Sequence, residues 1–243
     1  ASVQEVQKYV SLWNANYDCL FFCINQKLYD SLTPEQQAVV DEAGRKAVAY
    51  EREINRAGDE EILDRWQTKN GVEVLKYEDL DIESFKKAAE PVTEWFIGEL
   101  KNQGFDDAED LVNTFTENAA SAVKTAGIEN SSTYQVEDHS DLNWPEMTWN
   151  FTCSTTETST WAQAGRKFGE LMEQATGGKV KVDVYAADQL TGGNQSEGIQ
   201  ALMDGDPVQI SMHSNLIYSA FDPRFNVVSL PYLFDSVEDA DTV

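Results

Sequence analysis

The second half of the chain alternates between strand-like and helix-like hydrophobic patterns. Val180–Tyr185 alternates strictly between apolar and polar residues, which predicts a strand, and Met147–Cys153 and Val208–His213 are also predicted to be strands. Between them, Trp161–Thr176 and Gly193–Asp204 have the period of amphipathic helices. This β-α-β-α-β order predicts a parallel sheet with helices on its faces. We expect residues 216–225 to form a helical turn or loop and residues 227–234 an extended apolar run.

The first half begins with Gln4–Val10 and continues with an apolar run, Tyr17–Ile24, that predicts a buried strand. A long helix is then predicted from Pro34 to about Thr68. Thr33 suits its N-cap, proline suits the first helical position, and the glutamine three residues after the cap completes a capping box. The Asn-Gly pair at residues 70–71 is its first strong stop signal.

Further elements follow this helix. Val72–Lys76 predicts a short strand, and Ile82–Leu100 predicts a helix with a kink, or two consecutive helices, at Pro91. Glu109–Thr125 predicts a last helix. Residues 127–145 are rich in Ser, Asn, Asp and Glu with little periodicity, which is typical of a linker.

Composition narrows the classes of function. The 243 residues include 18 Lys and Arg against 43 Asp and Glu, a net charge of −25, with 41% hydrophobic and 11% aromatic residues. This aromatic content excludes a disordered acidic tail, and the negative charge disfavours binding to nucleic acid or anionic membranes. No apolar run approaches the length of about 20 residues that spans a bilayer. No basic and then apolar leader opens the chain, so we expect any signal peptide to be already absent.

Signals for metal binding and catalysis are weak. With only two histidines, no pair has metal-ligand spacing, so we expect no metal and no cofactor. Cys19 and Cys23 lie about 13 Å apart along a predicted strand, too far for a mutual disulfide. A pairing of Cys153 with one of them stays open, although free buried thiols are the simpler reading. No G-x-S-x-G motif is found, so no enzyme is predicted, and an α/β hydrolase is kept only as the alternative.

Several segments resemble the DctP-like solute-binding proteins of TRAP transporters. The resemblance covers nearly the whole chain apart from the linker and is carried by short motifs: Glu5–Tyr9, Asp30–Gln37, Asn150–Trp161, Gly165–Glu170, Thr176–Val182, Asp188–Leu190, Ala201–Gly205, Gln209-Ile210 and Leu230–Phe234. It implies an α/β fold of the type II periplasmic-binding-protein kind, in which a parallel or mixed sheet flanked by helices forms one lobe and the second lobe is incomplete. It also implies an extracytoplasmic, monomeric receptor that closes its lobes on a small organic acid and delivers it to the membrane components of a transporter.

The order of these segments differs from that of the family. Residues 1–130 are similar to the family's C-terminal part, with its crossing strand, long helix and terminal helices. Residues 146–243 are similar to its N-terminal lobe, and 131–145 is the linker. The family's central segment, with its RVP and DGQENP motifs, has no counterpart here. A permuted receptor, a junction of two tandem receptors and an incomplete record of a longer chain all fit this order.

The resemblance implies that an arginine of the central segment holds the ligand carboxylate, and none of the six arginines of this chain matches that position. We therefore expect weak binding of organic acids by this chain alone. A receptor fragment without full ligand binding is the second alternative.

Candidate ligand contacts lie where the predicted strands end, because ligands of parallel α/β sheets bind beyond the carboxyl ends of the strands. The resemblance points to Ser154, Gln195 and His213 there, and to Trp13 and Asn14 near the cleft; Trp161 could supply an apolar wall. Each also has a structural reading. The serine could be a turn residue, the glutamine a solvated helix start, the histidine a buried structural residue, and the tryptophans core residues.

Overall fold

The computed structural model describes residues 3–125 and 134–241. The chain divides into two compact units, the first formed by residues 1–19, 57–128 and 221–243 and the second by 20–56 and 129–220. The strands are β1 (Tyr9–Ser11), β2 (Leu20–Ile24), β3 (Glu73–Leu75), β4 (Met147–Cys153), β5 (Val180–Tyr185) and β6 (Ile210–Ser214). The α-helices are α1 (Gln26–Asp30), α2 (Pro34–Asn70), α3 (Ile82–Asn102), α4 (Ala108–Thr125), α5 (Thr160–Ala175), α6 (Gln195–Asp204), α7 (Asn215–Tyr218) and α8 (Val237–Ala240).

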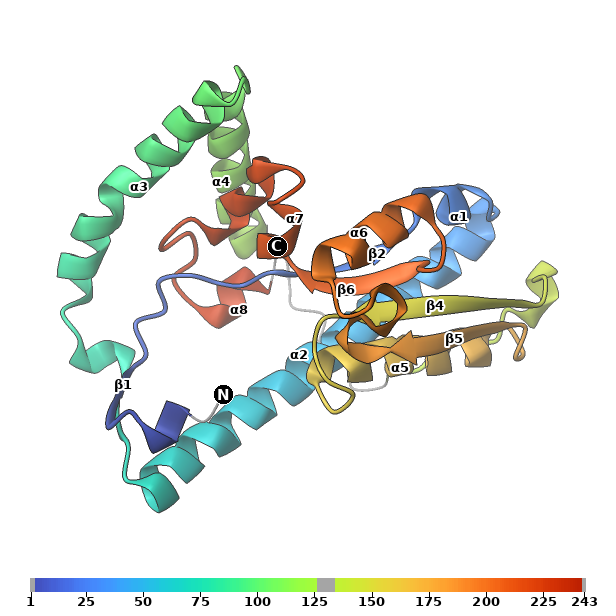
Figure 1. Cartoon of the computed structure of the whole chain (residues 1–243), viewed down its shortest axis with the longest axis horizontal. Coiled ribbons are helices and arrows are strands. Elements are labelled where there is room, and N and C mark those ends of the chain that lie inside the picture. The colour runs from blue at the N-terminus through green and yellow to red at the C-terminus, as the bar shows by residue number, and fades with distance from the viewer. Residues whose placement is uncertain (1–2, 126–133, 242–243) are drawn as a thin grey trace. The chain divides into compact units, whose positions relative to one another are not determined.

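A four-stranded sheet in the order β2-β6-β4-β5 forms the centre of the second unit (Figure 1). Strand β4 pairs in parallel with both β5 and β6, so that Phe151 lies opposite Val184 on one side and Ile210 on the other. Strand β2, from the first half of the sequence, pairs antiparallel with β6. The predicted parallel β-α-β-α-β arrangement is thus confirmed, and the added strand makes the sheet mixed.

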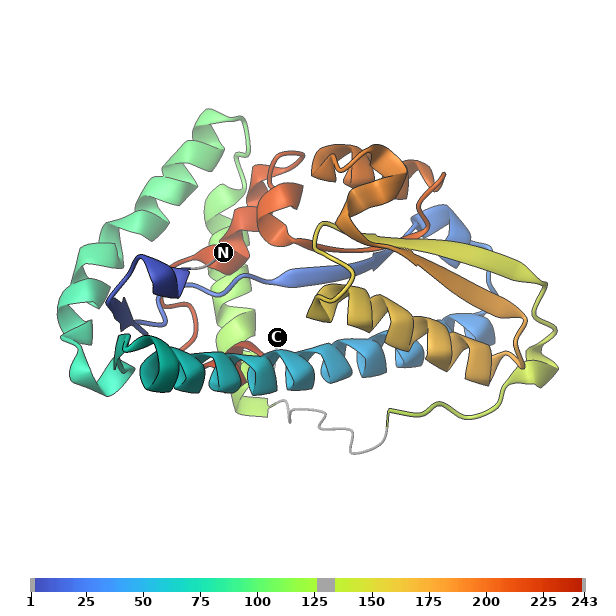
Figure 2. The same ribbon diagram turned by 60° about the horizontal axis from the view of Figure 1, so that its bottom comes forward.

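Helices cover both faces of this sheet (Figure 2). One face packs against α5 and the first half of α2, with Phe151 of the sheet, Phe168 of α5 and Ala43 of α2 completely or almost completely buried. The other face packs against α6 through Leu202 and Val208. Because both faces are covered, most residues of the central strands β4 and β6 are buried, and polar residues such as Thr152, Ser211 and His213 are buried together with the apolar ones.

Helix α5 lies very close to strand β4. A Cβ atom at Gly165 would lie 2.5 Å from Cδ1 of the Phe151 ring, so only glycine fits this contact. The adjacent Ala164 and Ala162 are also completely buried. Small residues on this face of α5 therefore fix the position of the helix, and with it the loop that joins β4 to α5.

The first unit contains a two-stranded parallel sheet and a helical pair. Strands β1 and β3 pair from Tyr9 opposite Glu73 to Ser11 opposite Leu75. Helices α3 and α4 pack against a 3₁₀ helix, Pro223–Ser229, around a separate apolar core. The buried members of that core are Phe96, Leu100, Ala108, Val112, Val227 and Leu230.

Two sequence predictions need correction, a choice between two alternatives is decided, and one helix was missed. The extended run predicted for 227–234 is wrong: its first residues belong to the 3₁₀ helix, which Asp222 caps by accepting from the amide of Arg224. Of the two alternatives at Pro91, two consecutive helices are not formed: α3 continues from Ile82 to Asn102, with Phe96 and Leu100 buried in the core. The strand predicted for 17–24 is confined to β2 and only half-buried, since β2 is an edge strand. Helix α1 was not predicted.

The described part of the predicted linker is attached to the second unit. Trp144 is buried and its indole Nε1 donates to the carbonyl of His139, whose amide donates to Ala175 at the end of α5. Residues 131–133 lie outside the described residues. The predicted division of the chain at 131–145 stays a prediction. The compact units instead interleave the two halves of the sequence, because β2 and the start of α2 pack with 134–220.

The three cysteines are free thiols. In the described ranges, none of the helices has the length and apolar character needed to cross a membrane. No group of three or more His, Cys, Asp or Glu side chains capable of holding a metal ion occurs among the described residues either.

Candidate functional site

The carboxyl ends of β4, β5 and β6 carry a buried polar cluster formed by Thr152, Asp188 and His213. Asp188 Oδ1 accepts a hydrogen bond from Thr152 Oγ1 and lies 2.9 Å from His213 Nε2. A carboxylate can only accept, so Nε2 donates. All three side chains are buried, with at most 1% of the residue surface exposed. Thr152 lies in β4, His213 lies in β6, and Asp188 lies in the turn after β5. Their hydrogen bonds therefore connect the carboxyl ends of the three parallel strands.

An unusual backbone conformation places the Asp188 carboxylate in this cluster. Ala187 and Asp188 both have positive φ, 53° and 48°, in the turn that follows β5. Helix α6 then packs directly on the carboxylate, since a Cβ at Gly198 would lie 2.8 Å from Asp188 Oδ1. Such backbone strain is tolerated only where the surroundings fix it. Here the cluster fixes both the turn after β5 and the start of α6.

Asp188 Oδ2 and His213 Nδ1 are buried, and neither has a hydrogen-bond partner among the described residues. The ring of His213 also meets that of Tyr218 edge to face, at 6.4 Å between centroids. Burial raises the pKa of the Tyr218 phenol far above its usual range, so this neighbour stays protonated. The cluster is thus a buried polar support beneath the strand ends.

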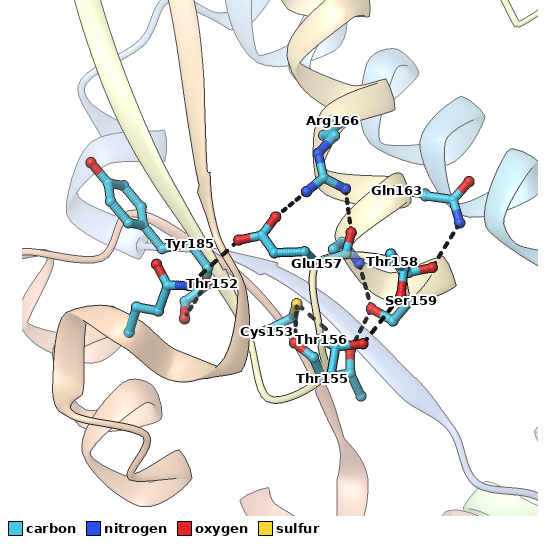
Figure 3. A network of polar contacts seen from close by, with 12 residues as sticks. Thr152, Cys153, Thr155, Thr156, Glu157, Thr158, Ser159, Gln163, Arg166 and Tyr185 are labelled. Atoms are coloured by element: carbon cyan, nitrogen blue, oxygen red, sulfur yellow. Dashed lines mark hydrogen bonds and ion pairs between the residues drawn. The ribbon is translucent and has the colours of Figure 1, made fainter.

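A loop rich in hydroxyl groups, residues 154–159, joins β4 to α5 above this support (Figure 3). Thr155 Oγ1 lies 2.7 Å from Ser159 Oγ, and Ser159 caps α5 by accepting from the amide of Ala162. The carbonyl of Thr155 accepts from the amide of Ala187, which joins this loop to the turn after β5. The two loops therefore form one continuous polar rim.

A charged pair stands on this rim. Arg166 of α5 donates to the carbonyl of Glu157 over 2.7 Å and forms an ion pair with its carboxylate (Figure 3). Gln189, from the turn after β5, approaches the same carboxylate at 3.5 Å. The arginine and the glutamate are 41% and 53% exposed, so solvent screens the pair and its contribution to stability is small.

The predicted ligand contacts of the second unit differ in exposure: some lie on the rim, and others are buried in the support beneath it. Ser154 directly follows β4 and is half-buried, and its hydroxyl has no hydrogen bond to the residues that the structure describes. Gln195 is exposed at the first position of α6. His213, in contrast, has no exposed surface, which agrees with its structural reading. Trp161 is partly buried and packs against the core around β4.

The two remaining predicted contacts belong to the first unit. Trp13 is 47% exposed and its ring meets that of Phe85 edge to face, at 5.3 Å. Asn14 is exposed and has a positive φ of 50°, a conformation that asparagine tolerates better than most residues. Both follow β1. Sequence reasoning did not single out Asp188 and Thr152, whose role depends on partners that are distant in the sequence.

Comparison with known proteins agrees with this arrangement. The sequence model of the bacterial extracellular solute-binding protein family 7, DctP, matches residues 1–99 and 151–243. No solved structure gives a significant match.

Three curated relatives share parts of the sequence. An uncharacterized protein of Haemophilus influenzae is 36% identical over 90 residues, which are 37% of this chain and 26% of that protein. The 2,3-diketo-L-gulonate-binding periplasmic protein YiaO of Escherichia coli is 33% identical over 103 residues, 42% of this chain and 30% of YiaO. Uncharacterized protein YiiZ of Salmonella typhimurium is 37% identical over 71 residues, 29% of this chain and 21% of YiiZ. The matched part thus spans less than a third of each relative.

The family match covers most of the chain, both halves included, and the fold it implies is the α/β fold observed. The chain belongs to the DctP family of bacterial extracellular solute-binding proteins, the receptors of TRAP transporters.

Proposed function

We propose that this chain captures a small organic acid at the strand-end rim of its second unit and passes it to a TRAP-type transporter. The observation that carries this proposal is the convergence of the carboxyl ends of β4 and β6 and the turn after β5 on one buried polar cluster. Ligands of parallel α/β sheets bind at this edge. YiaO, which is named for binding 2,3-diketo-L-gulonate, supports a carboxylate as the ligand class.

In this proposal Ser154 and Gln195 contact the solute, since both are accessible on the rim. The hydroxyl donates to an oxygen of the solute, and the amide can donate as well as accept. His213 and Asp188 act from below as positioning residues, because their burial keeps them from the solute. Trp161 keeps the loop after β4 in place. Trp13 and Asn14 are proposed contacts from the first unit once the two units close on the solute.

The proposed affinity is low. The rim segments 154–159 and 186–194 and the end of β6 with the start of α7, 213–215, contain no arginine or lysine, and the neighbouring Arg166 is already paired with Glu157. Hydroxyl and amide groups bind a carboxylate less strongly than a free guanidinium fork does. We therefore propose a Kd on the order of 1 mM for the chain alone, equivalent to about −4 kcal/mol.

The proposed setting follows from the family and the charge. We propose an extracytoplasmic protein, in the periplasm or anchored outside the cell, that works with the membrane components of a TRAP transporter. Its net charge of −25 opposes self-association and favours a monomer. Neither a metal nor a cofactor has a role in this mechanism.

The hydrolase alternative has less support. A histidine that serves as the base must contact both an acid and a nucleophile. His213 contacts Asp188 through Nε2, but its Nδ1 has no hydrogen-bond partner in the described part of the chain and is sealed from solvent. A substrate could not reach it without rearrangement of the strand ends, so we propose a receptor without catalysis.

Thermal-shift measurements test this proposal with 2,3-diketo-L-gulonate, gluconate and succinate, and with glucose as the uncharged control. An acid at ten times its Kd stabilises the folded state by about 1.4 kcal/mol. For a protein of this size, that raises Tm by roughly 3–6 °C.

Ser154→Ala and Gln195→Ala should reduce the shift at least about threefold, whereas Gln200→Ala, exposed further along the same helix, should preserve it. The proposal fails if none of the acids raises Tm at about 50 mM. It also fails if an acid is consumed during the incubation.

A further inference from the structure

Whereas the strand-end rim belongs to the second unit, a cavity lies within the first unit. Its volume is about 320 Å³, which is within the range of small-molecule sites. One wall is the face of α3 from Val92 to Gln103, and the other is the segment 223–231. Nothing in the proposed transport function uses this cavity, and all its lining residues belong to one compact unit.

The cavity has a rigid floor. Phe96, Leu100 and Leu230 line it and are at most 7% exposed, because they also belong to the apolar core that joins α3, α4 and the 3₁₀ helix. Beyond the cavity, Lys86 of α3 pairs with Asp235 and lies over the ring of Tyr232. The core contacts join the two walls beneath the cavity, and the contacts of Lys86 join them at one end, so the cavity is preformed.

The chemistry of the α3 wall is set by two adjacent rows of side chains. Val92, Phe96 and Leu100 follow one another at intervals of four residues and form an apolar row. Trp95 and Glu99 have the same spacing in the next row, so an indole and a carboxylate stand side by side at the cavity. The indole is 64% exposed, an unusual state for the largest apolar side chain.

Charge determines which ligand fits. Glu99 is the only ionisable side chain in the cavity lining. The nearest basic side chain along the 223–231 wall, Arg224, is engaged by both carboxylate oxygens of Asp222 and lies over the ring of Phe105. The first unit as a whole contains 24 Asp and Glu against nine Lys and Arg. An anion is therefore repelled, and a cation is attracted.

We propose that this cavity binds a small amphiphilic organic cation, an ammonium group on an aromatic or branched aliphatic body. The body fills the apolar floor over Phe96 and Leu230. The ammonium group pairs with Glu99 and lies against the face of Trp95, since indole is the strongest cation–π partner among the side chains. This ligand class is opposite in charge to the acid proposed for the strand-end rim.

Calorimetric titration of the full chain at low salt tests the proposal with three probes that share one phenyl body. These are phenethylammonium, the uncharged 2-phenylethanol and the anion phenylacetate. The cation should bind with 1:1 stoichiometry and at least about ten times more tightly than the alcohol, and phenylacetate should not compete with the cation. Intrinsic fluorescence should change as the cation binds, because Trp95 becomes covered.

Matched variants then assign the site. Glu99→Gln should lower the affinity for the cation to that for the alcohol, and Trp95→Ala should lower it at least about tenfold. Glu94→Gln, which removes the same charge from an exposed position of α3 outside the cavity, should change it less than about twofold. Far-UV circular dichroism and the urea midpoint of each variant establish that it is folded.

Three results would overturn the proposal: no binding of the cation at about 20 mM, equal binding of cation and alcohol, or an equal loss in Glu94→Gln and Glu99→Gln. None of them depends on the strand-end rim. A protein that binds organic acids but not the cation would leave the receptor proposal standing and remove this one.

Discussion

Replacing Gly198 with alanine introduces a methyl group into the polar cluster at the strand ends. The new Cβ would lie 2.8 Å from Asp188 Oδ1, 3.3 Å from its Cγ and 3.6 Å from His213 Nε2. Asp188 cannot turn away freely, because Oδ1 is held by Thr152 as well as by the histidine. Either the carboxylate gives up these bonds or α6 moves outward.

Two opposing effects determine how much Gly198→Ala changes the free energy of unfolding. Overpacking a well-packed interior costs about 1–3 kcal/mol, whereas exchanging glycine for alanine within a helix gains about 1 kcal/mol. We expect the free energy of unfolding to fall by up to about 2 kcal/mol rather than to rise by the full helix gain. With a urea m value of about 2 kcal/mol/M, the urea midpoint falls by up to roughly 1 M.

Gly44→Ala is the matched control. Gly44 lies within α2 in the same compact unit, and a Cβ there would meet nothing within 4 Å. This variant should therefore gain about 1 kcal/mol and raise the midpoint. Urea unfolding followed by far-UV circular dichroism compares the two variants with the parent chain. If both variants were stabilised equally, the account of a tightly packed strand-end cluster would be refuted.

Three further predictions concern individual side chains. Asp188→Ala leaves the Nε2–H of His213 buried without an acceptor. It should lower the free energy of unfolding, measured in urea, by about 2–3 kcal/mol. A loss below about 0.5 kcal/mol would contradict the described hydrogen bonds. Burial raises the pKa of the Cys153 thiol, so little thiolate forms at pH 8. Ellman's reagent should therefore label Cys153 in a slow phase, on the order of 100 times more slowly than a free thiol. Cys153→Ser should remove only this slow phase. Burial, the larger cause, and the hydrogen bond to Glu53, the smaller one, raise the pKa of Tyr134 to about 12. The protonated phenol therefore stabilises the folded state fully below about pH 10, and this stabilisation is lost as the pH rises through about 12. Absorbance at 295 nm should show this late titration, and a Tyr134→Phe variant that still shows it would contradict the assignment.

The sheet of the second unit could be predicted closely from the sequence. Met147–Cys153 and Val180–Tyr185 are strands with the predicted bounds, because their patterns are set by burial on a covered sheet and end at Gly, Pro or polar turns. The helix from Pro34 was also predicted, since its capping box is local: Thr33 and Gln36 bond each other's backbone amides.

Elements that depend on distant partners could not be predicted. Helix α1 is short and is anchored by Asn25, whose amide donates to the carbonyl of Leu202 on α6. Asn25 also caps α1 by accepting from the amide of Leu28. The sequence around α1 carries no signal of this tertiary contact, so propensity alone leaves the segment undecided.

The candidate site also contains residues that could be predicted from the sequence and residues whose role depends on distant partners. The family resemblance pointed to Ser154 and Gln195, and the structure has them directly after β4 and at the start of α6, the elements that the local pattern predicted. The role of Asp188 was hidden, because it needs a positive φ and a histidine 25 residues away. A buried carboxylate and an exposed one have the same sequence signature, and only the fold separates them.

Calorimetric titration of the intact chain with 2,3-diketo-L-gulonate, beside Ser154→Ala, is the most direct test of the receptor account. The account predicts saturable 1:1 binding with a Kd on the order of 1 mM, weakened at least about threefold in the variant. The absence of binding at about 50 mM, or equal affinity in both proteins, would contradict the assignment of solute capture to the ends of β4, β5 and β6.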